Sequence, residues 1–162
     1  MTSNRHSRFF TILAVSLCVN LMGCSRFSVT SDSAPSTTPT PAVCQPSPKQ
    51  VSKSGFPEIR ASMHTEGEAW ALLFFDQAQA GQDLKIVWRI TGTGDRLTVQ
   101  ARNADGTVIS PVWGPDYHES SDWERPGQEW GTGFNFPKPG CWVLTASRGT
   151  TSAEIRLEVL AP

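Results

Sequence analysis

The sequence is poor in charged residues and has almost no excess of either sign. Of its 162 residues 18% are charged, and 14 Lys and Arg stand against 15 Asp and Glu. Proteins that bind nucleic acid carry a basic stripe that follows the phosphates, so this composition predicts no nucleic-acid partner. Four cysteines are too few for a small scaffold that depends on many disulfides.

Long apolar runs and helical periodicity are also missing. The longest mostly apolar run covers residues 9–23, which is shorter than the roughly 20 residues that a membrane-spanning helix needs. No segment sustains the helical period of about 3.6 residues, whereas 13 Gly and 12 Pro favour turns. These absences favour short strands over helices.

The first 23 residues follow the pattern of a secretory signal peptide. Arg5 and Arg8 precede the apolar run, and the small residue Gly23 ends it. A charged start, a short apolar run and a small residue at the end are typical of a segment that is removed on export. Residues 1–23 are therefore predicted to be absent from the mature protein.

Leu21-Met22-Gly23-Cys24 resembles the lipobox of bacterial lipoproteins. The resemblance implies diacylglyceryl transfer to the thiol of Cys24, cleavage after Gly23 and a lipid anchor that holds the protein on the extracytoplasmic face of the cell membrane. The membrane is then its first partner. An ordinary signal peptide that is cut near a cysteine is the alternative interpretation.

Removal of residues 1–23 leaves a mildly acidic chain. Two arginines leave with this segment, so 12 basic residues stand against 15 acidic ones, a net charge of −3. A surface of this charge is not expected to bind anionic lipid or polymer through electrostatics alone.

Residues 24–54 are predicted to form a disordered tether. Of the 30 residues in 25–54, 17 are Ser, Thr or Pro. Such a segment buries too little apolar surface to offset the entropy cost of ordering it, and proline keeps it extended at about 3.1 Å per residue. A plain spacer is the simplest interpretation. A stalk that lifts the domain through cell-wall polymer is the alternative.

Residues 55–162 are predicted to form one all-β domain. Several segments alternate apolar and polar residues with the period of two that half-buried strands have, and Asp105-Gly106 predicts a hairpin turn. Six or seven short strands separated by Gly and Pro are typical of an immunoglobulin-like β-sandwich. The alternating segments are 84–91, 97–102 and 154–159; the run 70–75 is apolar throughout and predicts a central strand, and 141–147 pairs with 154–159 in a terminal hairpin.

Phe136-Pro-Lys-Pro-Gly-Cys-Trp142 is similar to the corner of immunoglobulin-like domains, where a Pro/Gly turn leads into a late strand. A wider set of segments resembles a group of uncharacterised bacterial lipoproteins. The resemblance implies a membrane-anchored, immunoglobulin-like extracytoplasmic domain, and it supplies no catalytic residue. The further segments that carry it are Trp70-Ala-Leu-Leu, Lys85-Ile-Val-Trp-Arg-Ile-Thr-Gly92 and Glu129-Trp-Gly-Thr-Gly-Phe134.

Cys44 and Cys141 are predicted to form a disulfide. Cys18 leaves with the signal peptide and Cys24 is acylated, so this pair remains in a compartment where disulfides persist. A bridge across a loop of this length removes about 4 to 5 kcal/mol of chain entropy from the unfolded state. The alternative is a buried free thiol at Cys141 and an exposed one at Cys44. A catalytic thiol is not expected, because the mature chain has only two histidines, His64 and His118.

The stretch 113–131 interrupts the alternating pattern and is the candidate functional loop. It holds three of the six tryptophans and the only tyrosine, and long irregular loops are usually functional or disordered. Its aromatic side chains would stack on sugar rings or peptide side chains. The simpler interpretation, which we favour for the loop itself, is a self-packed loop whose indoles cap an open end of the sandwich. The candidate binding residues are Trp113, Asp116, Tyr117, His118, Trp123, Arg125 and Trp130.

The loop contains few residue patterns that would support catalysis or metal binding. Asp116 with Glu119, or Asp122 with Glu124, would serve glycoside hydrolysis only if a cleft held them about 5 to 9 Å apart. Asp116, His118, Glu119 and Asp122 offer oxygen ligands for Ca²⁺, but their spacing matches no calcium loop, and zinc requires more Cys or His. We therefore predict no enzyme, no catalytic residue, no metal and no cofactor.

The leading hypothesis is a non-enzymatic binding or interaction module whose ligand is a glycan, a peptide or an envelope protein. The alternative is a structural or accessory subunit of an envelope protein complex, docked through the loop or an open sheet edge, and a small hydrolase comes third. Outside the loop, Arg89 is interpreted as solvated or ion-paired and His64 as a surface residue without a partner. The core tryptophans are predicted to be Trp70, Trp88 and Trp142.

Overall fold

The computed structural model describes residues 43–119 and 121–162. The predicted signal peptide, Cys24 and the predicted tether up to residue 42 lie outside these residues. Within them every element is a strand, and no helix is long and apolar enough to cross a membrane. The strands are β1 (Gln50–Val51), β2 (Pro57–Arg60), β3 (Ser62–Met63), β4 (Ala69–Leu73), β5 (Ala78–Gln79), β6 (Asp83–Ile90), β7 (Thr98–Asn103), β8 (Val108–Ile109), β9 (Trp113–His118), β10 (Gln128–Asn135), β11 (Gly140–Arg148) and β12 (Thr151–Leu160).

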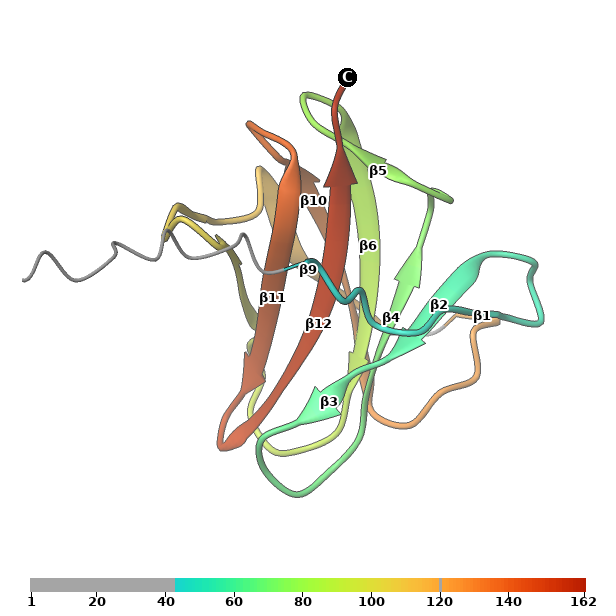
Figure 1. The fold of residues 1–162 in the computed structure, drawn as a ribbon. Helices are drawn as coiled ribbons and strands as arrows, with labels where there is room; N and C mark the ends of the chain where they lie inside the picture. The colour runs from blue at the N-terminus through green and yellow to red at the C-terminus, as the bar shows by residue number, and fades with distance from the viewer. Residues whose placement is uncertain (1–42, 120) are drawn as a thin grey trace, which may run out of the picture. The chain divides into compact units, whose positions relative to one another are not determined.

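The strands form two sheets that pack face to face. Sheet A has the order β1-β2-β4-β6-β10-β9, and sheet B has the order β3-β12-β11-β7-β8, with β5 pairing in parallel with β12. All other pairs are antiparallel. Figure 1 shows β11 and β12 of sheet B in front of β6 and β10 of sheet A. The domain is an all-β sandwich of the immunoglobulin-like kind, as the sequence predicts.

The core lies between the two sheets and follows the alternation in the sequence. Trp88 and Trp142 are fully buried in it. The Trp88 indole donates to Thr132 Oγ1 at 3.0 Å, and that hydroxyl donates in turn to the Ile86 carbonyl at 2.9 Å, so the buried indole N–H has its partner. The Asp105-Gly106 turn joins β7 to β8, and β11 and β12 form the terminal hairpin. These local predictions are confirmed.

The stretch 113–131 is more regular than its composition predicts. Two strands, β9 and β10, take up most of it, and they pair with each other across a β-bulge. The sequence hides them because Gly, Pro and Asp have low strand propensity, and both strands are rich in these residues. Long-range pairing of β10 with β6 overrides that local preference.

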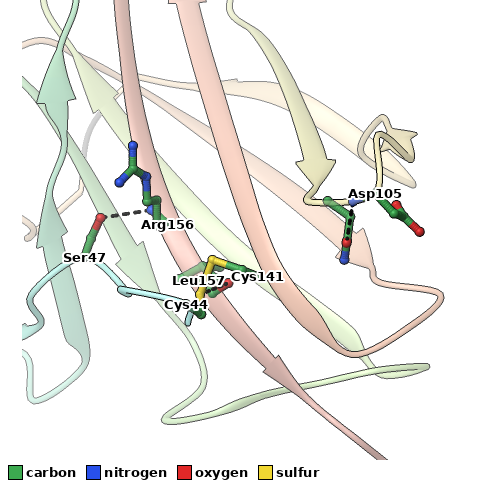
Figure 2. The surroundings of a disulfide bond; sticks show 7 residues. Cys44, Ser47, Asp105, Cys141, Arg156 and Leu157 are labelled. Carbon is green, nitrogen blue, oxygen red and sulfur yellow. Dashed lines mark hydrogen bonds between the residues drawn. A yellow bond between two sulfur atoms is a disulfide. The ribbon is translucent and has the colours of Figure 1, made fainter. Parts of the chain in front are cut away.

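The chain joins the sandwich earlier than its composition predicts. Residues 43–54, which we assigned to the tether, lie on the domain. Cys44 is bridged to Cys141 with a Cα–Cα distance of 5.2 Å, which confirms the predicted disulfide, and Figure 2 shows the bridge beside Leu157. Ser47 exchanges two 2.9 Å hydrogen bonds with the backbone of Arg156 on β12. The covalent bond and these backbone contacts hold a segment that has little apolar surface of its own.

Candidate binding surface

The aromatic residues of the predicted binding loop lie in three different places in the structure: in the core, buried on the outer face of sheet A, and exposed on the edge strand β9. Trp130 is 2% exposed and belongs to the core between the sheets, so its prediction as a binding residue is wrong. Trp123 is also buried, at 7%. Trp113 and Tyr117 on β9 are 41% and 51% exposed. The prediction of one platform built from the loop's tryptophans is therefore wrong, because only one of the three is accessible.

The outer face of sheet A carries three rows of side chains that run across the strands. Antiparallel register places residues from neighbouring strands side by side, which brings together positions far apart in the sequence. The first row is Phe56, Phe74, Lys85, Gly133 and Trp113; the second is Glu58, Leu72, Val87, Gly131 and Asp116; the third is Arg60, Trp70, Arg89, Glu129 and His118.

Residues 121–127, here called the cap, fold over the second and third rows. The Trp123 indole N–H donates to Glu58 Oε2 at 2.7 Å, and the Arg125 guanidinium binds both oxygens of the same carboxylate. That guanidinium also lies 4.2 Å from the centroid of the Trp70 ring. Four side chains form a second, smaller apolar cluster on the outer face: Trp70, Leu72, Val87 and Trp123. Trp70 is therefore buried as predicted, but in this cluster and not between the sheets.

Glu58 is the centre of this attachment. Its side chain is fully buried, and burial by itself disfavours a charged carboxylate. Hydrogen bonds from Arg125, Gln50 and Trp123 outweigh that burial and hold the pKa of Glu58 below its ordinary value of 4.5. The same contact raises the pKa of Arg125. The pair is therefore ionised at neutral pH, and two candidate binding residues serve to hold the cap.

A second buried carboxylate fastens the other end of the cap. Glu129 has a side chain that is 4% exposed and accepts hydrogen bonds from Arg89 Nε at 2.9 Å and Ser121 Oγ at 2.5 Å. His118 Nδ1 lies 3.4 Å from its other oxygen. Arg89 also donates to the Arg125 carbonyl at 2.6 Å, which confirms it as ion-paired. The self-packed alternative is thus correct for the cap, except that it covers a sheet face and not an end of the sandwich.

The first row remains uncovered. The Phe56 and Phe74 rings lie 4.5 Å apart and are 39% and 40% exposed, and Lys85 Nζ lies 4.4 Å from the centroid of Phe74. At the other end of the row, a Cβ added to Gly133 would lie 1.8 Å from the Trp113 indole nitrogen. The indole therefore fills the space that a side chain at Gly133 would take. We call Phe56, Phe74, Lys85 and Trp113 the open row.

A pocket of about 260 Å³ lies between the open row and the cap. Because typical small-molecule sites measure about 300–1,000 Å³, this pocket admits a single side chain or a small ring and not a large cofactor. Its lining combines apolar and polar side chains. Leu72, Val87, Phe56, Phe74 and Trp123 supply the apolar part, and Ser54, Lys85, His118, Ser121, Asp122 and Glu129 the polar part.

Two acidic residues of the loop, Asp122 and Glu124, line a small pocket of about 90 Å³ together. Asp122 also lines the pocket beside the open row, whereas Glu124 forms an exposed ion pair with Lys53 at 2.8 Å, which lowers the pKa of Glu124. Within residues 43–119 and 121–162, no group of three or more His, Cys, Asp or Glu side chains is gathered closely enough to hold a metal. His64 is half-exposed as expected, but its Nε2 lies 3.1 Å from Glu154 Oε2, so the prediction that it lacks a partner is wrong.

Sequence reasoning missed Phe56, Phe74 and Lys85 as surface residues of interest. The sequence pattern places Phe56 near the start of the predicted domain, Phe74 in the apolar run 70–75 and Lys85 at a polar position of an alternating strand. The only local signal was an aromatic residue at the end of each of two strands: Phe56 directly precedes β2, and Phe74 directly follows β4. Their grouping with Trp113 depends on strand register, which the local pattern does not contain.

Comparison with known proteins adds no relative to this picture. No protein-family model, curated protein or solved structure matches the chain. The resemblance to bacterial lipoproteins therefore depends on the sequence motifs alone.

Proposed function

We propose that this protein is a lipid-anchored lipoprotein of the extracytoplasmic face of the cell membrane, and that its sandwich is a non-enzymatic binding module. The lipobox at Cys24 and the Ser/Thr/Pro-rich segment after it support the anchor. The disulfide between Cys44 and Cys141 fits an oxidising compartment.

The open row is the observation that supports the binding role. Soluble domains rarely keep neighbouring large apolar side chains at the surface without a use for them, and tryptophan is enriched among residues that dominate binding energy. Phe56, Phe74 and Trp113 are each about two-fifths exposed, on one face of one sheet. The two buried carboxylates hold the cap against the same face of the sheet, and a surface that is ordered before binding loses less entropy when a ligand binds.

A docking role for the sheet edge is less well supported. Among the described strands, β9 is the only edge strand longer than two residues. Its Pro115 has no N–H to offer to a partner strand, and the bulge opposite β10 disturbs the ladder. We therefore propose that a ligand binds to the outer face of sheet A and not to its edge. The same applies if the partner is an envelope protein complex.

The anchor is tested by feeding cells radiolabelled palmitate and purifying the protein. We expect label on the wild-type protein and on a Cys18→Ser control, because Cys18 lies in the segment to be removed. Cys24→Ser should carry no label and should leave the membrane fraction. Label that persists in Cys24→Ser would contradict the proposed anchor.

The binding role is tested by photo-crosslinking in intact cells. A benzophenone amino acid placed at Phe56 or Trp113 should yield a crosslinked adduct. The same group at Val108, which is 42% exposed on β8 of sheet B, should yield none or much less. Equal adducts at all three positions, or none anywhere, would contradict a binding module that uses this face.

A further inference from the structure

We propose that the open row binds a protein segment in which one acidic residue lies between two large apolar side chains. This inference depends on the proposed binding function and names its ligand class. Three independent features carry it: the spacing of the row, the state of the charged groups around Lys85, and the size and lining of the pocket beside the row.

The spacing of the row suits an extended segment that crosses the strands. Neighbouring strands lie about 4.8 Å apart, so the row from Phe56 before β2 to Trp113 on β9 spans about 19 Å. An extended chain covers that distance with about six residues. Alternate side chains of such a chain point to the same side, so three of them meet the row in turn. The order that they meet is the aromatic pair, then Lys85, then the Trp113 indole above Gly133.

The charges around Lys85 call for an acidic ligand group. Among the described residues, Lys85 forms no ion pair, and its ammonium lies against the Phe74 ring. Two carboxylates of the same face are engaged elsewhere: Asp83 accepts a 2.9 Å hydrogen bond from Asn135, and Glu129 binds Arg89. Asp122 lines the same pocket as Lys85 but forms no ion pair with it. A carboxylate placed over the row would therefore meet a cation that has no ion pair among the described residues, and complementary charge favours that partner over a basic one.

The pocket beside the row favours a protein side chain over a sugar. Leu72 and Val87 line it with aliphatic side chains, whereas a sugar ring needs free polar groups around its edge to bind its hydroxyls. Several polar side chains of the lining already have partners within the protein: Ser54 binds Ser52, Glu129 binds Ser121 and Arg89, and His118 lies 3.4 Å from Glu129. The pocket volume of about 260 Å³ fits one apolar side chain of a larger partner.

A random peptide library displayed on phage tests the proposal against the lipidated protein in detergent micelles. Wild-type protein should enrich peptides in which Asp or Glu lies two residues from an apolar residue on each side. Lys85→Glu should enrich Lys or Arg at the same place. Phe74→Ala should weaken binding of the selected peptides by about tenfold or more. Val108→Ala is the matched control for an exposed apolar residue, and it should bind as the wild type does. Circular dichroism and melting curves confirm that each variant is folded.

The outcomes separate this inference from the proposed function. Enrichment of the same peptides by wild type and Lys85→Glu overturns the inference. Glucuronate is the second probe, because it joins a sugar ring to a carboxylate. Saturable glucuronate binding that Lys85→Glu abolishes, without peptide enrichment, also overturns the inference, but it leaves the binding function intact. If neither probe binds while Phe56 still crosslinks in cells, the ligand class is wrong and the function stands. If the crosslinking fails as well, both fail.

Discussion

Glu58→Gln tests whether a buried carboxylate holds the cap on sheet A. The substitution keeps the size of the side chain and removes its charge. Glu58 is fully buried, and Arg125, its ion-pair partner, has a side chain that is 29% exposed. Breaking one side of a buried ion pair costs about 3 to 5 kcal/mol. Because the Arg125 side chain is partly exposed and can be solvated once its partner is neutral, we expect a smaller loss of unfolding free energy, about 2 to 3 kcal/mol.

Urea unfolding at neutral pH measures this loss, and Glu124→Gln is the matched control. It also removes one carboxylate charge, here from the cap itself, but its ion pair with Lys53 has side chains that are 76% and 87% exposed. Exposed ion pairs contribute little to stability, so the control should unfold nearly as the wild type does. Equal losses for the two variants would refute the reasoning that burial gives Glu58 its weight.

The pH dependence gives a second check on the same residue. The pKa of Glu58 is lower in the folded protein than its ordinary value of 4.5. Its contribution is therefore fully present above that value and is lost as the pH falls through the lower, folded pKa. The difference in unfolding free energy between wild type and Glu58→Gln should shrink as the medium is acidified below that ordinary value. A difference that grows in acid would contradict the assigned direction.

Three further predictions follow from the structure. Replacing both disulfide cysteines by serine should lower the unfolding free energy by about 2 to 5 kcal/mol, seen by urea titration with and without reductant; a reductant-insensitive wild type would speak against the bridge. The Lys138 ammonium and the Thr107 backbone lower the pKa of Asp105 to about 2, and NMR of the carboxyl carbon should show the titration at that pH. Lys138→Ala should move the pKa of Asp105 toward 3.8. An unchanged pKa in that variant would contradict the contact. Gly133→Val should displace the Trp113 indole and increase its quenching by acrylamide, while Val108→Ala leaves quenching unchanged.

The domain's class and much of its strand order along the chain could be predicted from the sequence. Alternation with a period of two is a local consequence of one buried face, so the strands that contain Ile86, Val99 and Ile155 were found from their own residues. The disulfide was predicted by counting the cysteines that would remain after the predicted export. Each of these inferences needs only neighbouring residues or composition.

The candidate surface could not be predicted in the same way. The tryptophan-rich stretch contains two strands whose glycines and Pro115 conceal them, and their pairing depends on β6, some forty positions away in the sequence. Trp123 and Arg125 looked free for ligands until the structure placed Glu58, from the other end of the domain, beneath them.

The sequence by itself therefore determined which residues face the core in the alternating strands, because burial on one side of a strand leaves a repeating local pattern, but it did not identify Trp130 on β10 as a core residue. Only the tertiary structure decided which outward residues are neighbours. Strand register brings Phe56, Phe74, Lys85 and Trp113 into one row, and the cap buries the rows beside it. The physical reason is that contacts across strands depend on long-range pairing, which the local order of residues does not record.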